Sequence, residues 1–270
     1  MAARPITFLS DYGHDDEFVG VCRAVIARIA PGTSVVDLTH GIRRHAVAEG
    51  AAVLARALPH TAPGVHLAVV DPGVGSERRG VAVLTGEDDR ILVGPDNGLL
   101  SPAAERLGGT AAAVDISLSP LRLEPISATF HGRDLFAPVA AHLALGAALG
   151  DAGEEIEPSS LVSLPATGPR LEGATVVAHV VLVDRYGNAA LDLEHERLAK
   201  TGLRLGRPVR VQVPGSVREA PFVLTFSDAE PGELVVYEDS YRALALAVNR
   251  GSAAAELDLQ PGSEVVLSPA

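Results

Sequence analysis

The sequence has only one cysteine, no clustered basic residues and no long apolar run. Its cysteine, Cys22, cannot form an internal disulfide, and no charged-then-apolar leader opens the chain, so a cytoplasmic location is expected. No apolar run approaches the roughly 18 residues that a membrane span requires, so no membrane association is expected. The 22 Lys and Arg residues are scattered and the formal net charge is -12, which argues against a nucleic-acid partner. A small molecule is therefore the expected ligand.

Length and apolar content predict a folded protein of one large or two ordinary domains. Hydrophobic residues make up 47% of the 270 positions, which is ample for a core. Strand-like and helix-like segments alternate in the first half, whereas strand-like segments dominate the second half. We predict an α/β domain with a mainly parallel sheet over residues 1–165 and an all-β barrel domain over residues 171–270. The acidic stretch 150–169, which also contains serines and prolines, is interpreted as a linker.

Hydrophobic periodicity gives a coarse position for each element. In the first domain, strands are expected at 6–9, 34–38, 65–70, 80–84 and 91–93, and helices at 18–29, 47–58 and 135–149. In the second domain, antiparallel strands are expected at 174–183, 209–213, 222–226, 234–237 and 264–267.

Polar runs adjoin several of these elements in the first half. Asp71 opens the run DPGVGSER directly after the strand 65–70, and His131 lies in the run FHGRD directly before the helix 135–149. Asp11 and Asp16 lie in a third run that follows the first strand. Open α/β sheets bind ligands at the carboxyl ends of their strands, and a carboxylate placed like Asp11 commonly holds a ribose diol.

Each run also has an interpretation without function. Asp15 or Asp16 suits the N-cap of the following helix, residues 71–75 suit a plain turn, and His131 alone suits the first turn of a helix. Residues 184–188, with the sequence DRYGN, suit a hairpin turn. Four histidines lack metal-ligand spacing and are interpreted as structural, namely His40, His45, His60 and His66.

Taken in order, the motifs resemble those of one enzyme family. They are SDxGxxD from residue 10, DxTHG from 37, DPGVG from 71 with Arg78, GPDNGLL from 94, FHGRDLF from 130, DxxGN from 184, and Ser240 with Asn249. This set resembles the S-adenosylmethionine (SAM) hydroxide adenosyltransferases, which are SAM hydrolases related to the fluorinase and chlorinase enzymes. The resemblance runs from about residue 5 to the end of the chain.

The resemblance implies an α/β domain followed by a β-barrel domain, in a homotrimer. The substrate would lie between the first domain of one subunit and the second domain of its neighbour. SAM would be the substrate, adenosine and L-methionine the products, and neither a metal nor a separate cofactor is implied.

The resemblance also assigns roles to residues of this chain. The catalytic set would be Asp71, Arg78 and His131. In the first domain, Asp11 would hold the ribose hydroxyls, Asp16 would approach the methionine amine, and Phe130 would flank the ligand.

The second domain would supply the remaining contacts. Tyr186 would flank the ligand, Phe226 would stack on adenine, and Ser240 would lie near the methionine carboxylate. Asp184 and Asn188 would bind the methionine and adenine portions. Tyr241, followed by Arg242, stands where the fluorinase has an arginine for that carboxylate, so this contact stays open.

Three positions differ from the halogenating relatives. Those enzymes carry a tyrosine at the position of Asp71, and the fluorinase has a serine at Gly132 and a tryptophan at His45. We therefore expect no halide pocket.

The chemistry of a sulfonium favours the same three catalytic residues. Departure of a sulfonium neutralises a positive charge, so no general acid is needed to expel methionine, and the demand falls on the nucleophile. Water must lie in line with the C5′–S bond and lose a proton as the new bond forms. Asp71 would accept a hydrogen bond from that water, Arg78 would fix the carboxylate, and His131 would complete the cage or relay the proton.

Two other functions are compatible with the residues. The clustered carboxylates between Asp11 and Asp16 are also typical of a calcium-dependent nucleoside hydrolase, which would cleave an N-glycosidic bond with metal-bound water. A non-catalytic protein that binds adenosyl ligands would hold its ligand in stoichiometric amount and form no product. Chelation tests the first alternative and product analysis tests the second.

Overall fold

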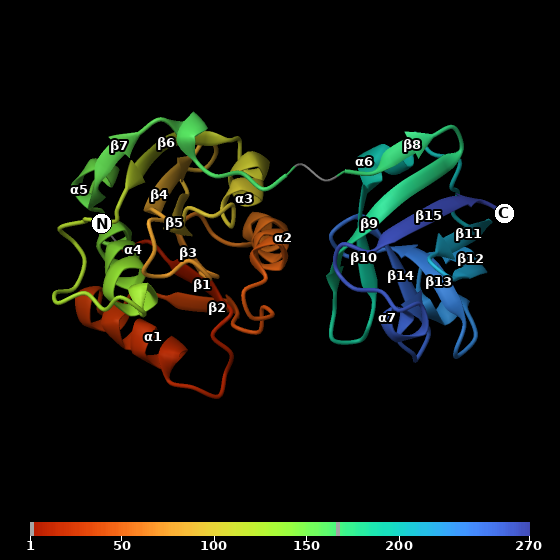
Figure 1. The fold of residues 1–270 in the computed structure, drawn as a ribbon, viewed down its shortest axis with the longest axis horizontal. Coiled ribbons are helices and arrows are strands. Elements are labelled where there is room, and N and C mark those ends of the chain that lie inside the picture. Colours follow the sequence, from red (N-terminus) through yellow and green to blue (C-terminus); the bar gives the residue numbers. More distant parts are fainter. Residues whose placement is uncertain (1–2, 166–167) are drawn as a thin grey trace. The chain divides into compact units, whose positions relative to one another are not determined.

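The structure, a computed structural model, describes residues 3–165 and 168–270 (Figure 1). These residues form two compact units, Met1–Leu164 and Pro165–Ala270. Among the described residues, no helix combines the length and the apolar character needed to cross a membrane.

The first unit is an α/β fold around one seven-stranded sheet, as predicted, although the sheet is mixed and only partly parallel. Its strand order is β2-β1-β3-β5-β4-β6-β7, with parallel pairing from β2 to β5 and antiparallel pairing from β5 to β7. The strands are β1 (Ile6–Ser10), β2 (Val35–Thr39), β3 (Val65–Val69), β4 (Gly80–Thr85), β5 (Ile91–Pro95), β6 (Thr110–Asp115) and β7 (Glu154–Ile156).

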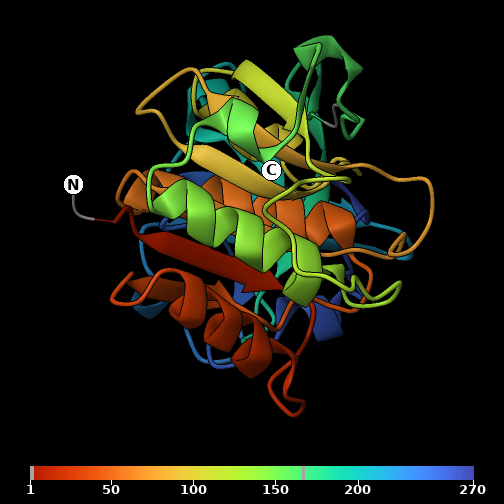
Figure 2. The same ribbon diagram turned by 90° about the vertical axis from the view of Figure 1, so that its left-hand side faces the viewer.

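Helices cover both faces of this sheet. Figures 1 and 2 show α1 (Phe18–Ile29) and α4 (Ala137–Ala144) together on one face, where they share a core with β1 and β3. On the other face lie α2 (Val47–Ala57), which a short 3₁₀ turn extends to His60, and α3 (Ser101–Arg106). Because both faces are covered, β1, β3 and β5 are buried along their whole length, which is why they read as continuous apolar runs.

The sheet register brings two predicted site loops together. Ser10, the last residue of β1, pairs with Val69, the last residue of β3. The chain leaves the sheet from these neighbouring positions, with Asp11 next to Ser10 and Asp71 two residues beyond Val69.

The helix expected at 135–149 is shorter and begins differently. Residues Gly132–Phe136 form a π-helical turn, and α4 then ends at Ala144. Gly146 has a φ of 100°, a left-handed conformation that ends the helix, and a separate turn, α5 (Leu149–Ala152), follows. The apolar run continues through Gly146 in the sequence, but the helix does not.

The prediction of a linker over 150–169 is wrong for most of its length. Strand β7 pairs with β6 at the sheet edge, and Leu161 and Leu164 pack against the core under α2 and α3. The backbone N–H of Val162 donates to the Asp96 carboxylate at 2.8 Å. The acidic, proline-containing composition thus gave no sign of the edge strand or of these two half-buried leucines. Residues 166 and 167 of the expected linker lie outside the described residues.

The second unit is a closed seven-stranded barrel, which confirms the predicted class. The order β10-β14-β13-β12-β11-β15-β9 closes through the β9–β10 pair, and β8 is added to β9. The strands are β8 (Arg170–Glu172), β9 (Thr175–Val183), β10 (Ala189–Glu194), β11 (Pro208–Val213), β12 (Ser216–Val223), β13 (Leu234–Glu238), β14 (Ala243–Val248) and β15 (Glu264–Pro269). Two short helices complete it, α6 (His195–Leu198) and α7 (Ala253–Glu256).

Three features of this barrel differ from the sequence prediction. Strands β10 and β14 were not expected, and β12 and β13 pair in parallel within an otherwise antiparallel barrel. The strand expected at 222–226 ends at Val223, and Phe226 lies in a 3₁₀ turn capped by Thr225. The chain between β12 and β13 runs back along the barrel instead of turning as a hairpin, so hairpin spacing gave no signal there.

Candidate active site

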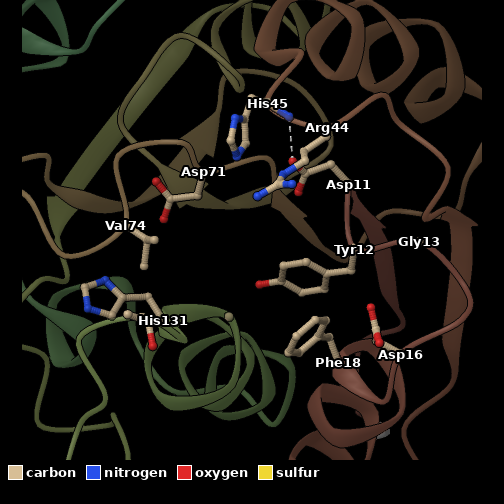
Figure 3. Close-up of a pocket in the computed structure, with 12 residues that line it drawn as sticks. Asp11, Tyr12, Gly13, Asp16, Phe18, Arg44, His45, Asp71, Val74 and His131 are labelled. Atoms are coloured by element: carbon tan, nitrogen blue, oxygen red, sulfur yellow. Dashed lines mark hydrogen bonds between the residues drawn. The ribbon is translucent and has the colours of Figure 1, made fainter.

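A cavity of about 460 Å³ opens at the carboxyl edge of β1 and β3 (Figure 3). Its walls come from the loops that follow β1, β2 and β3 and from the segment at the start of the π-helical turn. The lining residues are Asp11, Tyr12, Gly13, Asp16, Phe18, Arg44, His45, Asp71, Val74, Thr129, His131 and Gly132.

The three residues predicted to be catalytic lie together: Asp71 and His131 line this cavity, and Arg78 does not line it but binds both of them. Arg78 binds both carboxylate oxygens of Asp71, with Nε donating to Oδ1 at 2.8 Å and Nη2 donating to Oδ2. Arg78 Nη2 also donates to Nδ1 of His131 at 2.9 Å. The guanidinium lies 5.1 Å from the ring centroid of Phe136, so a cation–π contact holds it from another side. The side chains of Asp71 and Arg78 are only 6% and 10% exposed, so solvent screens their attraction weakly.

His131 is held in one protonation state by these neighbours. Burial and the Arg78 guanidinium lower the pKa of His131 below its usual 6.5, although Asp71 and Asp134 oppose the shift. Arginine can only donate hydrogen bonds, so Nδ1 accepts and the proton of the neutral ring is on Nε2. His131 is therefore a hydrogen-bond donor at Nε2 and has no free lone pair with which to take a proton.

The loop between Asp71 and Arg78 folds back so that its two ends meet. Ser76 Oγ donates to the Gly73 carbonyl at 2.7 Å and accepts from the Arg78 backbone N–H at 3.3 Å. Gly75 has a φ of 78°, and a Cβ there would lie 2.5 Å from the Ala128 carbonyl oxygen. Only glycine permits this turn to lie against the segment that carries His131.

Asp11 is fixed from outside its own loop. Its Oδ2 accepts from the backbone N–H of His45 at 2.9 Å, and His45 has a φ of 65°. The loop itself is held by His40, whose Nδ1 lies 2.8 Å from Ser10 Oγ and whose carbonyl accepts from the Gly13 N–H at 2.8 Å. Burial lowers the pKa of His40, and a carboxylate oxygen of Asp37 lies 3.3 Å from its Nε2. His40 and the backbone of His45 thus position Asp11 and its loop, and His45, which was interpreted only as structural, also lines the cavity.

Asp16 lines the cavity and does not cap the following helix. The residue before α1 is Glu17, and no side chain caps the helix. The capping alternative for Asp15 or Asp16 is therefore wrong, and the Asp16 carboxylate stays available at the cavity wall (Figure 3).

An aromatic cluster forms another side of the cavity. The rings of Tyr12 and Phe18 lie 5.8 Å apart, and Phe130 meets them edge-on at 5.9 and 5.2 Å. Phe130 is not among the lining residues, and the Arg133 guanidinium covers it at 5.0 Å from the ring centroid.

Several lining residues were not predicted from the sequence. They include Tyr12 and Gly13, which directly follow Asp11, and Arg44 and His45, which belong to the loop after β2. The one signal in the sequence that could have identified them is their position in loops at the carboxyl ends of parallel strands. Arg44 is an exposed cation at the cavity and has no hydrogen bond or ion pair within the described chain.

In the second unit, Asp184 organises a tight loop between β9 and β10. Its carboxylate accepts from the backbone N–H groups of Tyr186 and Asn188, both at 2.9 Å, and from the Asn188 amide at 2.8 Å. Tyr186 is 72% exposed. The Gly187 carbonyl accepts from the Ala254 N–H of α7, and Ala189, the first residue after this loop, pairs with Leu246 near the end of β14.

The other predicted residues of this unit lie elsewhere on the barrel. Ser240 and Tyr241 precede the start of β14, so the six residues of that strand, about 20 Å, separate them from the Asp184 loop. Phe226 is 42% exposed and its ring lies 4.9 Å from that of Tyr237. The predicted residues of the second unit thus form two groups, at opposite ends of β14.

Within residues 3–165 and 168–270, no three His, Cys, Asp or Glu side chains are grouped as a metal site would require.

Comparisons with known proteins cover nearly the whole chain. Residues 6–153 match the SAM hydroxide adenosyltransferase N-terminal domain, and residues 178–266 match the C-terminal domain of the same family. An (R)-S-adenosyl-L-methionine hydrolase from Salinispora tropica is 49% identical over 98% of both chains. A fluorinase from an Actinoplanes species is 28% identical over 98% of this chain and 97% of its own.

A solved structure has the same fold. It is an uncharacterized conserved protein from Thermotoga maritima, with 37% identity and a TM-score of 0.92, over 97% of this chain and 99% of that one. Both family domains are present in order, and together they span most of the sequence. This chain therefore belongs to the SAM hydroxide adenosyltransferase family.

Proposed function

We propose that this protein hydrolyses (R)-S-adenosyl-L-methionine to adenosine and L-methionine, by attack of water on C5′ of the ribose. The observation that carries the proposal is the buried Asp71–Arg78–His131 group, which shares one cavity with the carboxylates of Asp11 and Asp16. The 49% identity to a hydrolase of this substrate over 98% of both chains supports the same activity.

Asp71 has the geometry of a group that orients and deprotonates water. Arg78 occupies one lone pair on each carboxylate oxygen, and each oxygen keeps another with which to accept a water proton. As water attacks, the O–C5′ bond forms, the C5′–S electron pair passes to sulfur, and Asp71 takes the proton. Because methionine leaves as a neutral thioether, no acid is needed on the leaving side.

His131 and Arg78 keep that carboxylate ready for attack. His131 accepts from Arg78 through Nδ1, so it completes the cage as a donor from Nε2 and does not relay the proton. In-line placement of water by such a fixed group supplies on the order of 7 kcal/mol of barrier reduction.

The charge of the cavity suits the rest of the substrate. SAM carries a sulfonium and an ammonium group, and Asp11 and Asp16 present carboxylates on two sides of the cavity (Figure 3). Asp11, fixed by the His45 N–H, holds the ribose diol, and Asp16 binds the ammonium group. Tyr12 and Phe18 flank the ligand from the aromatic cluster, and Phe130, predicted to do so, packs against their rings outside the cavity lining.

Residues of the second unit complete the site in this proposal, and they come from a neighbouring subunit of a homotrimer. Asp184, Tyr186 and Asn188 share one tight loop with an exposed tyrosine, which suits a contact with a ligand. Phe226, Ser240 and Tyr241 form the second group. Since about 20 Å of β14 separates the groups, they bind different parts of the extended substrate.

Product analysis tests this proposal against its alternatives. Purified protein with SAM, a chelator and no added metal should yield adenosine and methionine in equal amounts. Methylthioadenosine as the main product, or loss of activity with the chelator, contradicts the proposal. Stoichiometric binding without product indicates a non-catalytic protein, and a free adenine base indicates a nucleoside hydrolase.

A further inference from the structure

Tyr12 has no task in the reaction above, yet its ring is fixed beside the reacting groups. It meets Phe8 and Phe130 edge-on, with centroids 6.5 and 5.9 Å apart, and Phe18 at a tilt. A largely buried phenol usually has a hydrogen-bond partner. Within residues 3–165 and 168–270, the Tyr12 hydroxyl has none, so this group is left for a ligand of the cavity.

Gly132 makes room for this hydroxyl. A Cβ built on Gly132 would overlap the hydroxyl oxygen of Tyr12 and lie 3.0 Å from Cζ of the ring. Gly132 is the neighbour of His131, so the hydroxyl can lie beside the backbone at this position only because residue 132 has no side chain. Figure 3 shows the hydroxyl directed into the cavity, toward the side that carries Asp71, Val74 and His131.

The phenol also stays protonated beside Asp71. Burial is the main cause that raises the pKa of Tyr12 well above 10, and the nearby carboxylates of Asp11 and Asp71 raise it further. A neutral hydroxyl can donate one hydrogen bond and accept others, whereas a carboxylate can only accept.

Building on the proposed function, we propose that the Tyr12 hydroxyl is the second hydrogen-bonding partner of the attacking water, with Asp71 as the first. One O–H of the water points to Asp71 and the other to the phenol oxygen, which leaves a lone pair of the water aimed at C5′. In the reaction, Asp71 takes the first proton, the O–C5′ bond forms, and the C5′–S pair passes to sulfur. The phenol neither gains nor loses a proton.

The first test is Tyr12→Phe, which removes one oxygen atom and keeps the ring contacts. We expect kcat to fall roughly 10-fold, the size of one lost hydrogen bond, while KM for SAM and the melting temperature stay close to wild type. An unchanged kcat, whether or not KM rises, overturns the role of Tyr12. An inactive wild-type protein would instead overturn the proposed function itself, so the two failures are distinguishable.

A second test moves the hydroxyl to the neighbouring position. In the Tyr12→Phe background, Gly132→Ser adds a Cβ beside the position that the phenol oxygen leaves, with a hydroxyl bonded to it, and Gly132→Ala adds the same Cβ alone. Both double variants place the same Cβ 3.0 Å from the remaining ring carbon, so they share this close contact and differ only by the serine hydroxyl. We expect the serine variant to exceed the alanine variant several-fold in kcat. Equal rates would show that a hydroxyl at this point does not assist the water.

Discussion

Replacement of Asp71 by asparagine tests the role of the buried carboxylate. The asparagine keeps the shape of the side chain but offers one acceptor oxygen instead of two, and its NH₂ group faces an N–H of Arg78. The variant can neither take a proton from water nor hold Arg78 at both ends. Loss of general-base help typically lowers kcat by roughly 10²- to 10⁴-fold, or about 3 to 5 kcal/mol of barrier. SAM binding should persist, because Asp11 and Asp16 are untouched.

The structure supplies a matched control for this variant. Asp96 pairs with Arg79 through two hydrogen bonds of 3.0 and 2.6 Å, and its side chain is 4% exposed, but it does not line the cavity. Asp71→Asn leaves one Arg78 N–H facing an NH₂ group, and Asp96→Asn leaves either Arg79 or the Val162 N–H without its acceptor, so each costs about 1 to 3 kcal/mol of stability. Both variants should melt several degrees below wild type, and only Asp71→Asn should lose turnover.

The assay is steady-state release of adenosine, with kcat and KM measured separately and melting followed in parallel. Wild-type kcat in Asp71→Asn would refute the assignment of Asp71. An equal loss of kcat in Asp96→Asn would also refute it, because the effect would then come from stability and not from the carboxylate.

His131, His66 and the assembly give three further predictions. The pKa of His131 is lowered below 6.5, and only the neutral ring can accept from Arg78. We therefore expect kcat/KM to be constant from pH 8 to 6.5 and to decrease only below pH 6.5. A decrease with its midpoint at or above pH 6.5 contradicts this. Burial lowers the pKa of His66 to about 3. Between pH 6.5 and 3, His66 therefore binds more protons in the unfolded chain than in the folded one, and the free energy of unfolding decreases as the pH is lowered, by up to about 1.4 kcal/mol per pH unit. His66→Gln should make the melting temperature depend less on pH in this range. An unchanged dependence would show that other groups cause it. Sedimentation should give a homotrimer, and a fully active monomer would rule out sites shared between subunits.

The sequence was sufficient for elements whose burial is uniform. Strands β1, β3 and β5 are covered on both faces, so each is an uninterrupted apolar run that ends at a polar loop. Strand β7 could not be found in this way, because its two glutamates face solvent at the sheet edge and resemble linker composition. The parallel β12–β13 pair depends on a long return through residues 224–233, which leaves no hairpin signature.

The same contrast applies to the site. Asp71 and Arg78 were predictable as neighbours because they belong to one short run with two glycines, and the turn at Gly75 brings their side chains together. The contact between the Tyr12 hydroxyl and Gly132 joins residues far apart in the sequence, so no local pattern contains it. Only the packed aromatic rings determine how far that hydroxyl reaches.

Oxygen labelling tests the central claim most directly. When the wild-type protein turns over SAM in heavy-oxygen water, mass spectrometry of the products should find one heavy oxygen per adenosine, at the 5′ position, and none in methionine. This result is expected because the group at Asp71 delivers water to C5′. Unlabelled adenosine, label in methionine, or a 5′-halo nucleoside formed in the presence of chloride or fluoride would contradict it.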